Sequence, residues 1–214
     1  MKILVVDDHA LVREGLRQVL KGLDTDVQVL EAATCARAFE LAVTHADIDL
    51  VLLDYHLPDM NGLDALDFFA RQVPELPIIV LSGSVNPRIV QQVMHKGAAA
   101  FLTKSGMSEE LLSATRMVLA GDVYVPSALM TSSPMPLEPE PRQPAPLFTP
   151  RQEEVLYLLM EGRTNKEISR MLSLSDETVK NHISGILRGF GVQTRTQAVL
   201  AANRCGYTGS MPSS

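Results

Sequence analysis

The chain has 214 residues, of which 46% are hydrophobic and 21% are charged, and its net charge at pH 7 is −6. At about 100–200 residues per domain, this length accommodates one large domain or two small ones. No apolar run approaches the ~20 residues that span a bilayer, and the N-terminal apolar run is too short for a signal peptide. The two cysteines, Cys35 and Cys205, are too few for a disulfide framework or a cysteine zinc site. We therefore expect a cytoplasmic protein, in a reducing compartment and without a membrane partner.

Six of the 13 prolines lie within residues 131–146, in the stretch TSSPMPLEPEPRQPAP, which predicts an extended, semi-stiff linker. The charge divides at this stretch. Residues 1–130 hold 10 Lys and Arg against 17 Asp and Glu, a net charge of −7, whereas residues 147–214 hold 8 against 6, a net charge of +2. We expect domains at 1–125 and 147–206, a linker at 126–146 and a tail at 207–214. The positive charge of the second domain hints at nucleic acid as its partner.

The first domain alternates short apolar runs with segments of helical periodicity. The runs predict strands at residues 3–6, 27–30, 50–53, 78–81 and 99–103. The segments between and after them predict helices at residues 11–20, 35–44, 63–71, 87–96 and 109–120. Near-continuous apolar strands are typical of a parallel sheet that is covered on both faces. We therefore predict an α/β domain with a doubly wound, five-stranded parallel sheet.

Polar side chains follow four of these five strands. Asp7 and Asp8 follow the first strand, and Asp54 follows the third. Ser82 follows the fourth strand, and Lys104 follows the fifth. Because the carboxyl ends of parallel strands meet at one edge of the sheet, we expect these five side chains to converge there.

Such a cluster of side chains has a specific chemistry. Three carboxylates repel one another unless a cation lies among them, and oxygen ligands with open positions suit Mg²⁺. A carboxylate beside Mg²⁺ can act as a nucleophile and become an acyl phosphate, while Ser82 and Lys104 hold phosphoryl oxygens. Gly83 has no side chain and leaves room for a phosphoryl group. A helix cap or a turn residue is the alternative for each residue alone, but together they indicate a phosphoryl site.

The first 125 residues resemble the receiver domain of bacterial two-component response regulators, which has a flavodoxin-like fold. The matching residues are Asp7-Asp8, Asp54 in LVLLDYHLPDMNG, Ser82 in IIVLSGS and Lys104 in AAAFLTK. The resemblance implies that Asp54 accepts a phosphoryl group from a cognate sensor histidine kinase. It implies that Ser82 and Lys104 bind the phosphoryl oxygens. The Mg²⁺ ligands that it implies are Asp7, Asp8, Asp54 and the backbone carbonyl of His56.

Three further residues of this domain have roles that remain open. Phe101 stands at the aromatic switch position of the family. The resemblance implies that Phe101 and Ser82 change position on phosphorylation. Phenylalanine lacks the hydroxyl of the tyrosine in many relatives, so Phe101 can report only by packing, and a plain core residue is the alternative. His9 and His56 flank the pocket, where we expect solvated or supporting roles. His56 stands where the family's side chain influences the rate of dephosphorylation.

The second domain has helical patterns and no strand-like runs, which predicts a small all-α domain. The helices are expected at residues 150–160, 165–172, 176–190 and 194–202. Thr149 and Ser175 should cap the first and third helices, with Pro150 at the first helical position. The second and third helices are joined by a short turn, which is the spacing of a helix-turn-helix. An ordinary helical hairpin with a solvated polar face is the alternative.

The stretch from residue 148 to 202 resembles the LuxR-type helix-turn-helix, so the whole chain resembles a NarL/FixJ-type response regulator. The matching residues include Thr149-Pro150-Arg151, Gly162, Asn165-Lys166-Glu167-Ile168, Thr178-Val179-Lys180 and His182. The resemblance implies that Lys180, Asn181 and Ser184 face the bases of double-stranded DNA. The residues that it places near the phosphate backbone are Lys166, Thr178, His182 and Arg188. It makes the helix at 194–202 the dimer contact.

Several residues depart from the LuxR pattern. Ser184 stands where relatives often carry Lys or Arg, which predicts weaker base readout at that position. Gly189 replaces a frequent basic residue, and Phe148 stands where leucine is usual. Gly185 and Gly189 each cost about 0.5–1 kcal/mol relative to Ala within a helix. They lie on one face, which suggests that another backbone approaches closely.

We predict a phosphorylation-controlled transcriptional regulator and not a dedicated enzyme. Phosphorylation should shift an inactive–active equilibrium and free a DNA-binding helix that the receiver covers in many relatives. Two C-terminal domains in a homodimer should then bind a pseudo-palindrome in promoter DNA. The alternatives are a phosphatase or phosphotransferase that uses Asp54, a protein-interaction module, and a regulator that ignores phosphorylation. Enzymes of that kind commonly have an acid two residues after the nucleophile, where this chain has His56.

Overall fold

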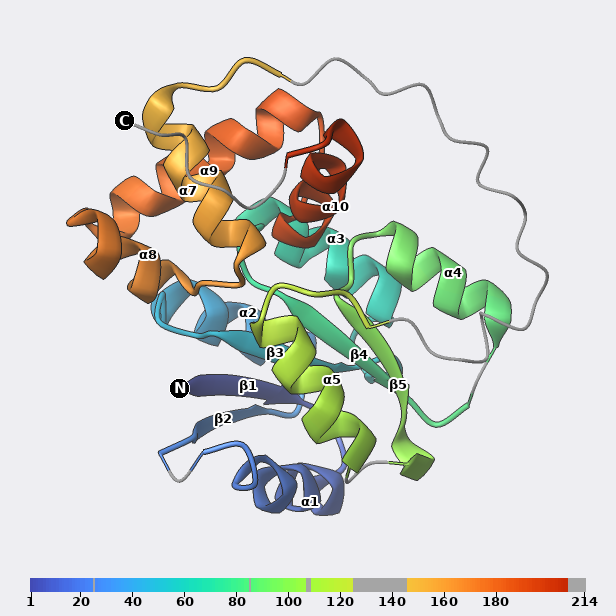
Figure 1. Ribbon diagram of the computed structural model, residues 1–214. Helices are drawn as coiled ribbons and strands as arrows, with labels where there is room; N and C mark the ends of the chain where they lie inside the picture. The colour runs from blue at the N-terminus through green and yellow to red at the C-terminus, as the bar shows by residue number, and fades with distance from the viewer. Residues whose placement is uncertain (25, 85, 107–108, 125–145, 208–214) are drawn as a thin grey trace.

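The computed structural model describes residues 1–24, 26–84, 86–106, 109–124 and 146–207. The predicted linker at 126–146, except for its last residue, lies outside the described residues, and so does the predicted tail from residue 208 onward. Figure 1 shows an α/β region with a helical region packed on one end of it. Within the part of the chain described, no helix is long and apolar enough to cross a membrane.

The N-terminal region forms a five-stranded, all-parallel sheet in the order β2-β1-β3-β4-β5, which confirms the predicted fold class. The strands are β1 (Lys2–Val6), β2 (Gln28–Ala32), β3 (Leu50–Asp54), β4 (Ile78–Ser82) and β5 (Ala100–Thr103). Among the strands, the largest difference from the predicted bounds is at β2, which runs two residues further than the apolar run indicated. Pairing with β1 sets this length, because Val6 lies opposite Ala32. The edge position of β2 allows Glu31 to be exposed within the strand.

Helices cover both faces of this sheet (Figure 1). They are α1 (Ala10–Leu20), α2 (Cys35–Thr44), α3 (Gly62–Gln72), α4 (Pro87–His95) and α5 (Glu109–Leu119), and η1 (Lys104–Gly106) is a short 3-10 turn. Alternate strand residues pack in opposite directions, so Leu4 and Val51 face α2, α3 and α4, whereas Ile3 and Leu52 face α1 and α5. The two resulting cores explain why the strands are apolar at nearly every position.

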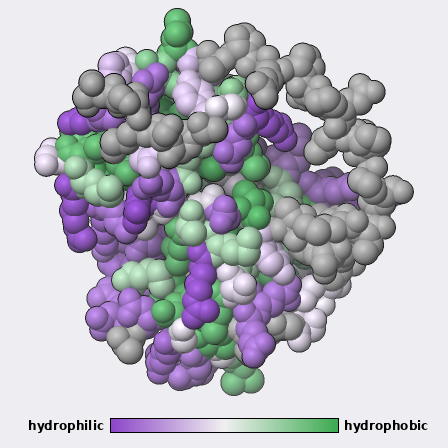
Figure 2. All heavy atoms as spheres, viewed as in Figure 1, coloured by the Kyte–Doolittle hydropathy of each residue, from purple (hydrophilic) through white to green (hydrophobic). Residues whose placement is uncertain are grey.

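Four helices form the C-terminal domain: α7 (Pro150–Met160), α8 (Asn165–Leu172), α9 (Asp176–Phe190) and α10 (Arg195–Cys205). Thr149 caps α7 as predicted, with Pro150 in the first turn, and Ser175 caps α9 by accepting a hydrogen bond from the backbone N–H of Thr178. Thr164 and Thr194 form capping boxes at α8 and α10. One apolar core joins these helices, and Figure 2 shows hydrophilic side chains over much of their visible outer surface.

Two details of this domain differ from the sequence-based expectation. A Cβ atom at Gly185 would lie 2.4 Å from Nε2 of Gln152, and one at Gly189 would lie 2.4 Å from Cε1 of Phe148. Side chains, and not another backbone, therefore occupy the space beside both glycines. Tyr207, which we expected in the tail, packs against the helical core, and its hydroxyl donates a hydrogen bond of 3.0 Å to the Pro146 carbonyl.

The contact between Gly189 and Phe148 predicts a coupled pair of substitutions. Gly189→Ala should destabilise the full chain by about 1–3 kcal/mol, because the new methyl group overpacks against the ring and outweighs the better helix propensity of alanine. In the Phe148→Leu background the same substitution should cost less or stabilise. Urea unfolding of the four proteins measures this coupling, and equal effects of Gly189→Ala in both backgrounds would contradict the packing account.

Candidate phosphoryl-acceptor site and its link to the DNA-binding helices

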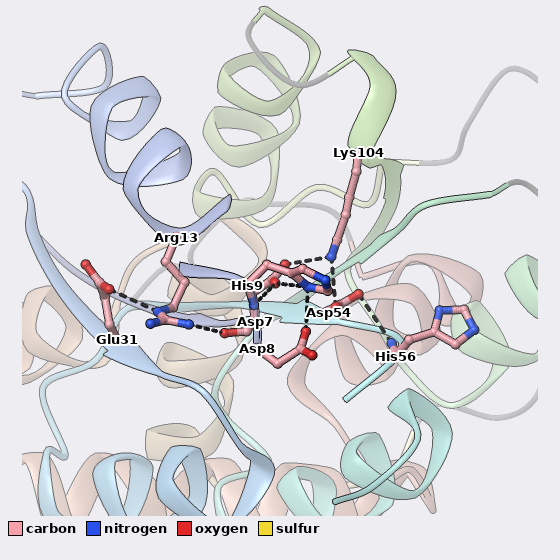
Figure 3. A network of polar contacts seen from close by, with 8 residues as sticks. All are labelled: Asp7, Asp8, His9, Arg13, Glu31, Asp54, His56 and Lys104. Carbon is pink, nitrogen blue, oxygen red and sulfur yellow. Dashed lines mark hydrogen bonds and ion pairs between the residues drawn. The ribbon is translucent and has the colours of Figure 1, made fainter. Parts of the chain in front are cut away.

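The five polar residues that follow the strands converge at the carboxyl edge of the sheet, as predicted. Asp54 and Ser82 are the last residues of β3 and β4, and Asp7 follows β1 directly. All three are buried. Asp8 is more exposed, and Lys104 reaches into the group from η1 (Figure 3). Because β1, β3, β4 and β5 are neighbours in the sheet, residues as far apart in sequence as Asp7 and Lys104 meet here.

One ammonium group serves two buried carboxylates. Nζ of Lys104 lies 2.7 Å from Oδ2 of Asp7 and 2.8 Å from Oδ2 of Asp54. The two aspartate side chains are 0% and 3% exposed, and that of Lys104 is 19% exposed, so water screens these contacts only weakly. The pocket therefore keeps its carboxylates together through a cation that belongs to the chain itself.

Burial and pairing shift the ionisation of this pair. Burial raises the pKa of the Asp54 carboxyl, and the hydrogen bond from Lys104 opposes this effect without cancelling it. Burial by itself lowers the pKa of Lys104, but its hydrogen bonds to Asp54 and Asp7 outweigh burial, and the pKa is raised. The nearby ammonium of Lys104 thus favours the charged form of Asp54, which burial disfavours.

The donor set fits a divalent metal ion. Ligand atoms of Asp7, Asp8, His9 and Asp54 all lie within 4.8 Å of one another. Three carboxylates against the single charge of Lys104 leave two negative charges uncompensated, which is the charge of one Mg²⁺. Carboxylate oxygens are the ligands that Mg²⁺ prefers. That the backbone carbonyl oxygen of His56 is a further ligand stays a prediction.

A second group of residues holds the turn that carries the acids. Nη1 of Arg13 donates a hydrogen bond of 2.7 Å to the Asp7 carbonyl, and its Nε donates one of 3.1 Å to Glu31 of β2 (Figure 3). The backbone N–H of His9 donates one of 2.9 Å to the Asp7 carboxylate. Sequence reasoning missed Arg13 and Glu31, because a charged pair on a helix and an edge strand resembles any solvated pair.

The other predicted receiver residues lie around this pocket. A Cβ at Gly83 would meet no atom within 4 Å, which is the open space expected for a phosphoryl group. Phe101 is buried in the core between the sheet and α4, so its packing can respond to movement there. The backbone N–H of His56 donates to Asp54 Oδ1 over 3.3 Å, but its ring points away from the carboxylate (Figure 3). The effect of the His56 side chain on the rate of dephosphorylation stays a prediction.

The predicted DNA contacts lie on α8 and on one side of α9. Val179, Ile183 and Ile186 are buried in the helical core, so α9 turns its other face outward. Asn181 and Arg188 are exposed on that face. The remaining predicted contacts are partly buried, namely Lys166, Thr178, Lys180, His182 and Ser184.

Two of these predicted contacts are bound to the receiver. Nζ of Lys180 lies 3.2 Å from Oε1 of Glu75, and this carboxylate is only 12% exposed. Nζ of Lys166 lies 3.4 Å from Oδ2 of Asp47 and donates to the Asp47 carbonyl over 3.3 Å. Hydrogen bonding to Lys2 and the charge of Lys166 help to hold the pKa of Asp47 below its usual value. The acidic receiver therefore neutralises lysines that the resemblance assigns to DNA.

The N-terminus of α10 also docks on the receiver. The backbone N–H of Arg195 donates a hydrogen bond of 2.8 Å to the Pro74 carbonyl, just after α3. Nε2 of Gln197 donates one of 3.0 Å to the His95 carbonyl, and Oγ1 of Thr194 donates one of 3.4 Å to the Gly97 carbonyl, both at the end of α4. One backbone N–H and two side chains at the start of α10 thus donate to carbonyls near the ends of α3 and α4, where the helix dipoles attract.

Close packing of backbones completes the contact between the regions. Gly162, after α7, has φ +75°, and a Cβ there would lie 1.9 Å from the carbonyl carbon of Ala120. Burial lowers the pKa of the Arg195 guanidinium to about 10. A cavity of about 30 Å³, lined by both regions, is room for about one water molecule. The resemblance led us to expect that the receiver covers the DNA-binding helix, but sequence reasoning missed the residues of this contact. Glu75 and Asp47 form no motif, and Gly162 stood out only as a match to the LuxR pattern.

Comparison with known proteins gives the class to which this fold and this site belong. Residues 3–116 match the family described as the response regulator receiver domain, and residues 146–202 match the bacterial regulatory proteins of the luxR family. The chain is a two-component response regulator with a LuxR-type DNA-binding domain, and thus a transcriptional regulator. It belongs to the NarL/FixJ type, which confirms the resemblance seen in the sequence.

The similarity extends over nearly the whole chain. The chain is 34% identical over 217 residues to the glycerol metabolism activator of Pseudomonas putida, with 97% of each chain covered. It is 31% identical over 201 residues to the nitrate/nitrite response regulator protein NarL of Escherichia coli K12, with 92% and 93% covered. A solved structure of the RcsB response regulator of Salmonella typhimurium shares the fold, with a TM-score of 0.57, 23% identity, and 95% and 99% covered.

The shared ammonium predicts a pH-dependent loss of stability in Lys104→Met. Removing one partner of a buried pair costs about 3–5 kcal/mol, because the carboxylates stay buried without their counter-charge. The folded-state pKa of Asp54 is already raised, so its ionisation opposes folding as the pH rises above the ordinary aspartate value of about 3.9. Without Lys104 this pKa rises further. The stability that Lys104→Met loses relative to the wild type should therefore grow between about pH 5 and about pH 7.5.

Urea unfolding at both pH values, without divalent ions, measures this deficit. Lys21→Met, which changes an exposed lysine at the end of α1, is the matched control and should change stability little at either pH. A Lys104→Met deficit that is the same at both pH values would contradict the electrostatic account.

Proposed function

We propose that Asp54 accepts a phosphoryl group from a sensor histidine kinase, and that this event releases the C-terminal domain to bind promoter DNA as a homodimer. One observation carries the proposal. In one structure the acidic pocket is assembled, and two of the predicted DNA contacts, Lys180 and Lys166, form ion pairs with the same receiver. An acceptor site and a covered DNA-binding surface in one chain are the two parts that a phosphorylation switch needs.

The proposed chemistry is transfer from phosphohistidine to Asp54. A carboxylate oxygen of Asp54 forms a bond to phosphorus as the phosphorus–nitrogen bond breaks, and the electron pair stays on the departing imidazole, which then takes up a proton. The ammonium of Lys104 and the hydroxyl of Ser82 stand at neighbouring strand ends, from which they can donate to the phosphoryl oxygens. Asp7, Asp8 and Asp54 would hold Mg²⁺, which would neutralise charge on these oxygens. The result is an acyl phosphate on Asp54.

The path from the pocket to the DNA-binding domain runs through α4. Ser82 ends β4, α4 begins at Pro87, and the carbonyls at the end of α4 accept hydrogen bonds from α10. A shift of Ser82 toward a phosphoryl group would move the chain that leads into α4. Such a shift biases the equilibrium between docked and released states, because only the docked state makes these bonds.

Release would expose a surface suited to DNA. Lys180 and Lys166 would exchange receiver carboxylates for phosphates, and α10 would become available as the dimer contact. With a net charge of +2, one domain should bind weakly and with strong dependence on salt, whereas two linked domains gain effective concentration. A pseudo-palindrome with half-sites about one helical turn apart fits such a dimer.

We also infer that the chain is not a dedicated enzyme and that it acts in the cytoplasm. His56 stands where phosphotransferases of this kind commonly carry an acid. The DNA-binding domain allows phosphorylation to act through a change in DNA binding. A kinase, DNA and a second copy of the chain are thus the proposed partners.

The phosphorylation step predicts a simple difference between wild type and Asp54→Asn. DNA fragments are first selected from a random pool by the wild-type chain in the presence of a small phosphodonor. The phosphodonor should then raise the affinity of the wild type for the selected DNA at least about tenfold, and leave Asp54→Asn unchanged. Equal affinity of both proteins with the phosphodonor, measured by fluorescence anisotropy at one salt concentration, would refute the coupling.

The ion pair between Lys180 and Glu75 predicts partial release without phosphorylation. Glu75→Gln removes the carboxylate that holds Lys180 and keeps the shape of the side chain. If the pair contributes about 1 kcal/mol, the unphosphorylated variant should bind the selected DNA about fivefold more tightly. The matched control is Glu40→Gln, which removes an exposed carboxylate of α2 that pairs with Arg37. No gain for Glu75→Gln over this control would mean that the contact does not restrain DNA binding.

A further inference from the structure

His9 lies between the acidic turn and α1, and its imidazole is not used as a helix cap. It is the N-cap residue of α1, yet its side chain makes no capping hydrogen bond. Nδ1 lies 2.7 Å from Oδ1 of Asp8 and 3.3 Å from Oδ1 of Asp7 (Figure 3). The side chain is 67% exposed, so core packing does not force this orientation. The imidazole is therefore directed at the carboxylates, and nothing in the proposed phosphoryl transfer uses it.

The size of the cluster matches a single ion. The ligand atoms of His9, Asp7, Asp8 and Asp54 all lie within 4.8 Å of one another. Two ligands on opposite sides of a metal ion, each at about 2.1–2.3 Å, are separated by about 4.2–4.6 Å. One nitrogen and three oxygens can thus surround a common centre after only small adjustments of the side chains.

We propose that His9 is a nitrogen ligand of this metal site and strengthens the binding of transition-metal ions such as Mn²⁺ and Co²⁺ more than the binding of Mg²⁺. The proposal rests on the metal site of the proposed function and adds a fourth side-chain ligand to it. Mg²⁺ prefers oxygen ligands and dehydrates reluctantly, whereas imidazole suits the later divalent ions of the first transition row. The affinity that a nitrogen ligand adds is larger for Co²⁺ than for Mn²⁺, which follows the general order of affinities of these ions.

An imidazole that only hydrogen-bonds to Asp8 would have a different consequence. It would orient the carboxylate for every ion alike, so its removal would weaken Mg²⁺, Mn²⁺ and Co²⁺ by similar factors. A direct ligand affects the ions unequally and leaves its nitrogen nucleus coupled to the unpaired electrons of Mn²⁺.

The test uses the metal-free full chain as wild type, His9→Ala and His9→Gln. His45→Ala, which removes a histidine at the end of α2, is the control for weak binding to other histidines. Calorimetric titrations with MgCl₂, MnCl₂ and CoCl₂ give three affinities for each protein. Both His9 variants should lose at least about tenfold in Co²⁺ affinity, less in Mn²⁺ affinity, and no more than about twofold in Mg²⁺ affinity.

Pulsed electron paramagnetic resonance of the Mn²⁺ complex provides the second readout. The wild type and His45→Ala should show coupling to a ¹⁴N nucleus, and both His9 variants should lose it. Equal losses for all three ions, or ¹⁴N coupling that survives in the His9 variants, would overturn the proposal while leaving the metal site intact. Failure of wild type to bind any of the ions would instead contradict the metal site of the proposed function, and with it this proposal.

Discussion

Two buried carboxylates that share one ammonium group are the constraint on which the rest of the receiver depends. Asp7 and Asp54 have lost nearly all contact with water, and the Nζ atom of Lys104 lies within 2.8 Å of both. The sheet stabilises the arrangement by bringing the strand ends together, since the side chains come from three different parts of the chain. The pocket has more negative charge than Lys104 can balance, so it is built to take up further positive charge. In the proposed function a divalent ion would supply that charge, and a phosphoryl group on Asp54 would rearrange it.

The second half of the molecule is held by groups that would otherwise be unsatisfied. The backbone N–H of Arg195 has no partner within α10 and donates to the Pro74 carbonyl after α3, while the side chain of Gln197 donates to the His95 carbonyl at the end of α4. Lys180 and Lys166 are paired with Glu75 and Asp47 of the receiver. The acidity of the receiver, which looked unsuited to a DNA-binding protein, thus has two uses. It forms the carboxylate pocket at the carboxyl edge of the sheet, and it pairs with Lys180 and Lys166 of the DNA-binding domain through Glu75 and Asp47.

Much of the fold and of the pocket could be predicted from the sequence, because their signals are local. Continuous apolar runs marked the strands, and parallel pairing then required Asp7, Asp54, Ser82 and Lys104 to meet at one edge. The caps at Thr149 and Ser175 were also readable, because a cap depends on a few neighbouring residues. The orientation of the His9 ring, however, depends on the path of the turn that follows β1.

The contact between the two regions was not readable in this way. Glu75 and Asp47 resemble any surface acids, and their partners, Lys180 and Lys166, lie more than 100 residues further along the chain. Gly185 and Gly189 signalled a close approach, but only the folded structure shows that Gln152 and Phe148 are what approaches. The roles assigned to the individual DNA-contacting residues stay predictions, because they follow from the resemblance alone.

The central claim is that the acceptor site controls the docking of α10, and hydrogen exchange at the Arg195 amide tests it most directly. This N–H is the first of the helix and has no partner within α10, so its protection comes from the Pro74 carbonyl of the receiver. In the full chain with Mg²⁺, exchange should be slow without a phosphodonor and much faster with one, whereas amides in the middle of α9 should be unaffected. Equal protection of the Arg195 amide in both states would contradict the account.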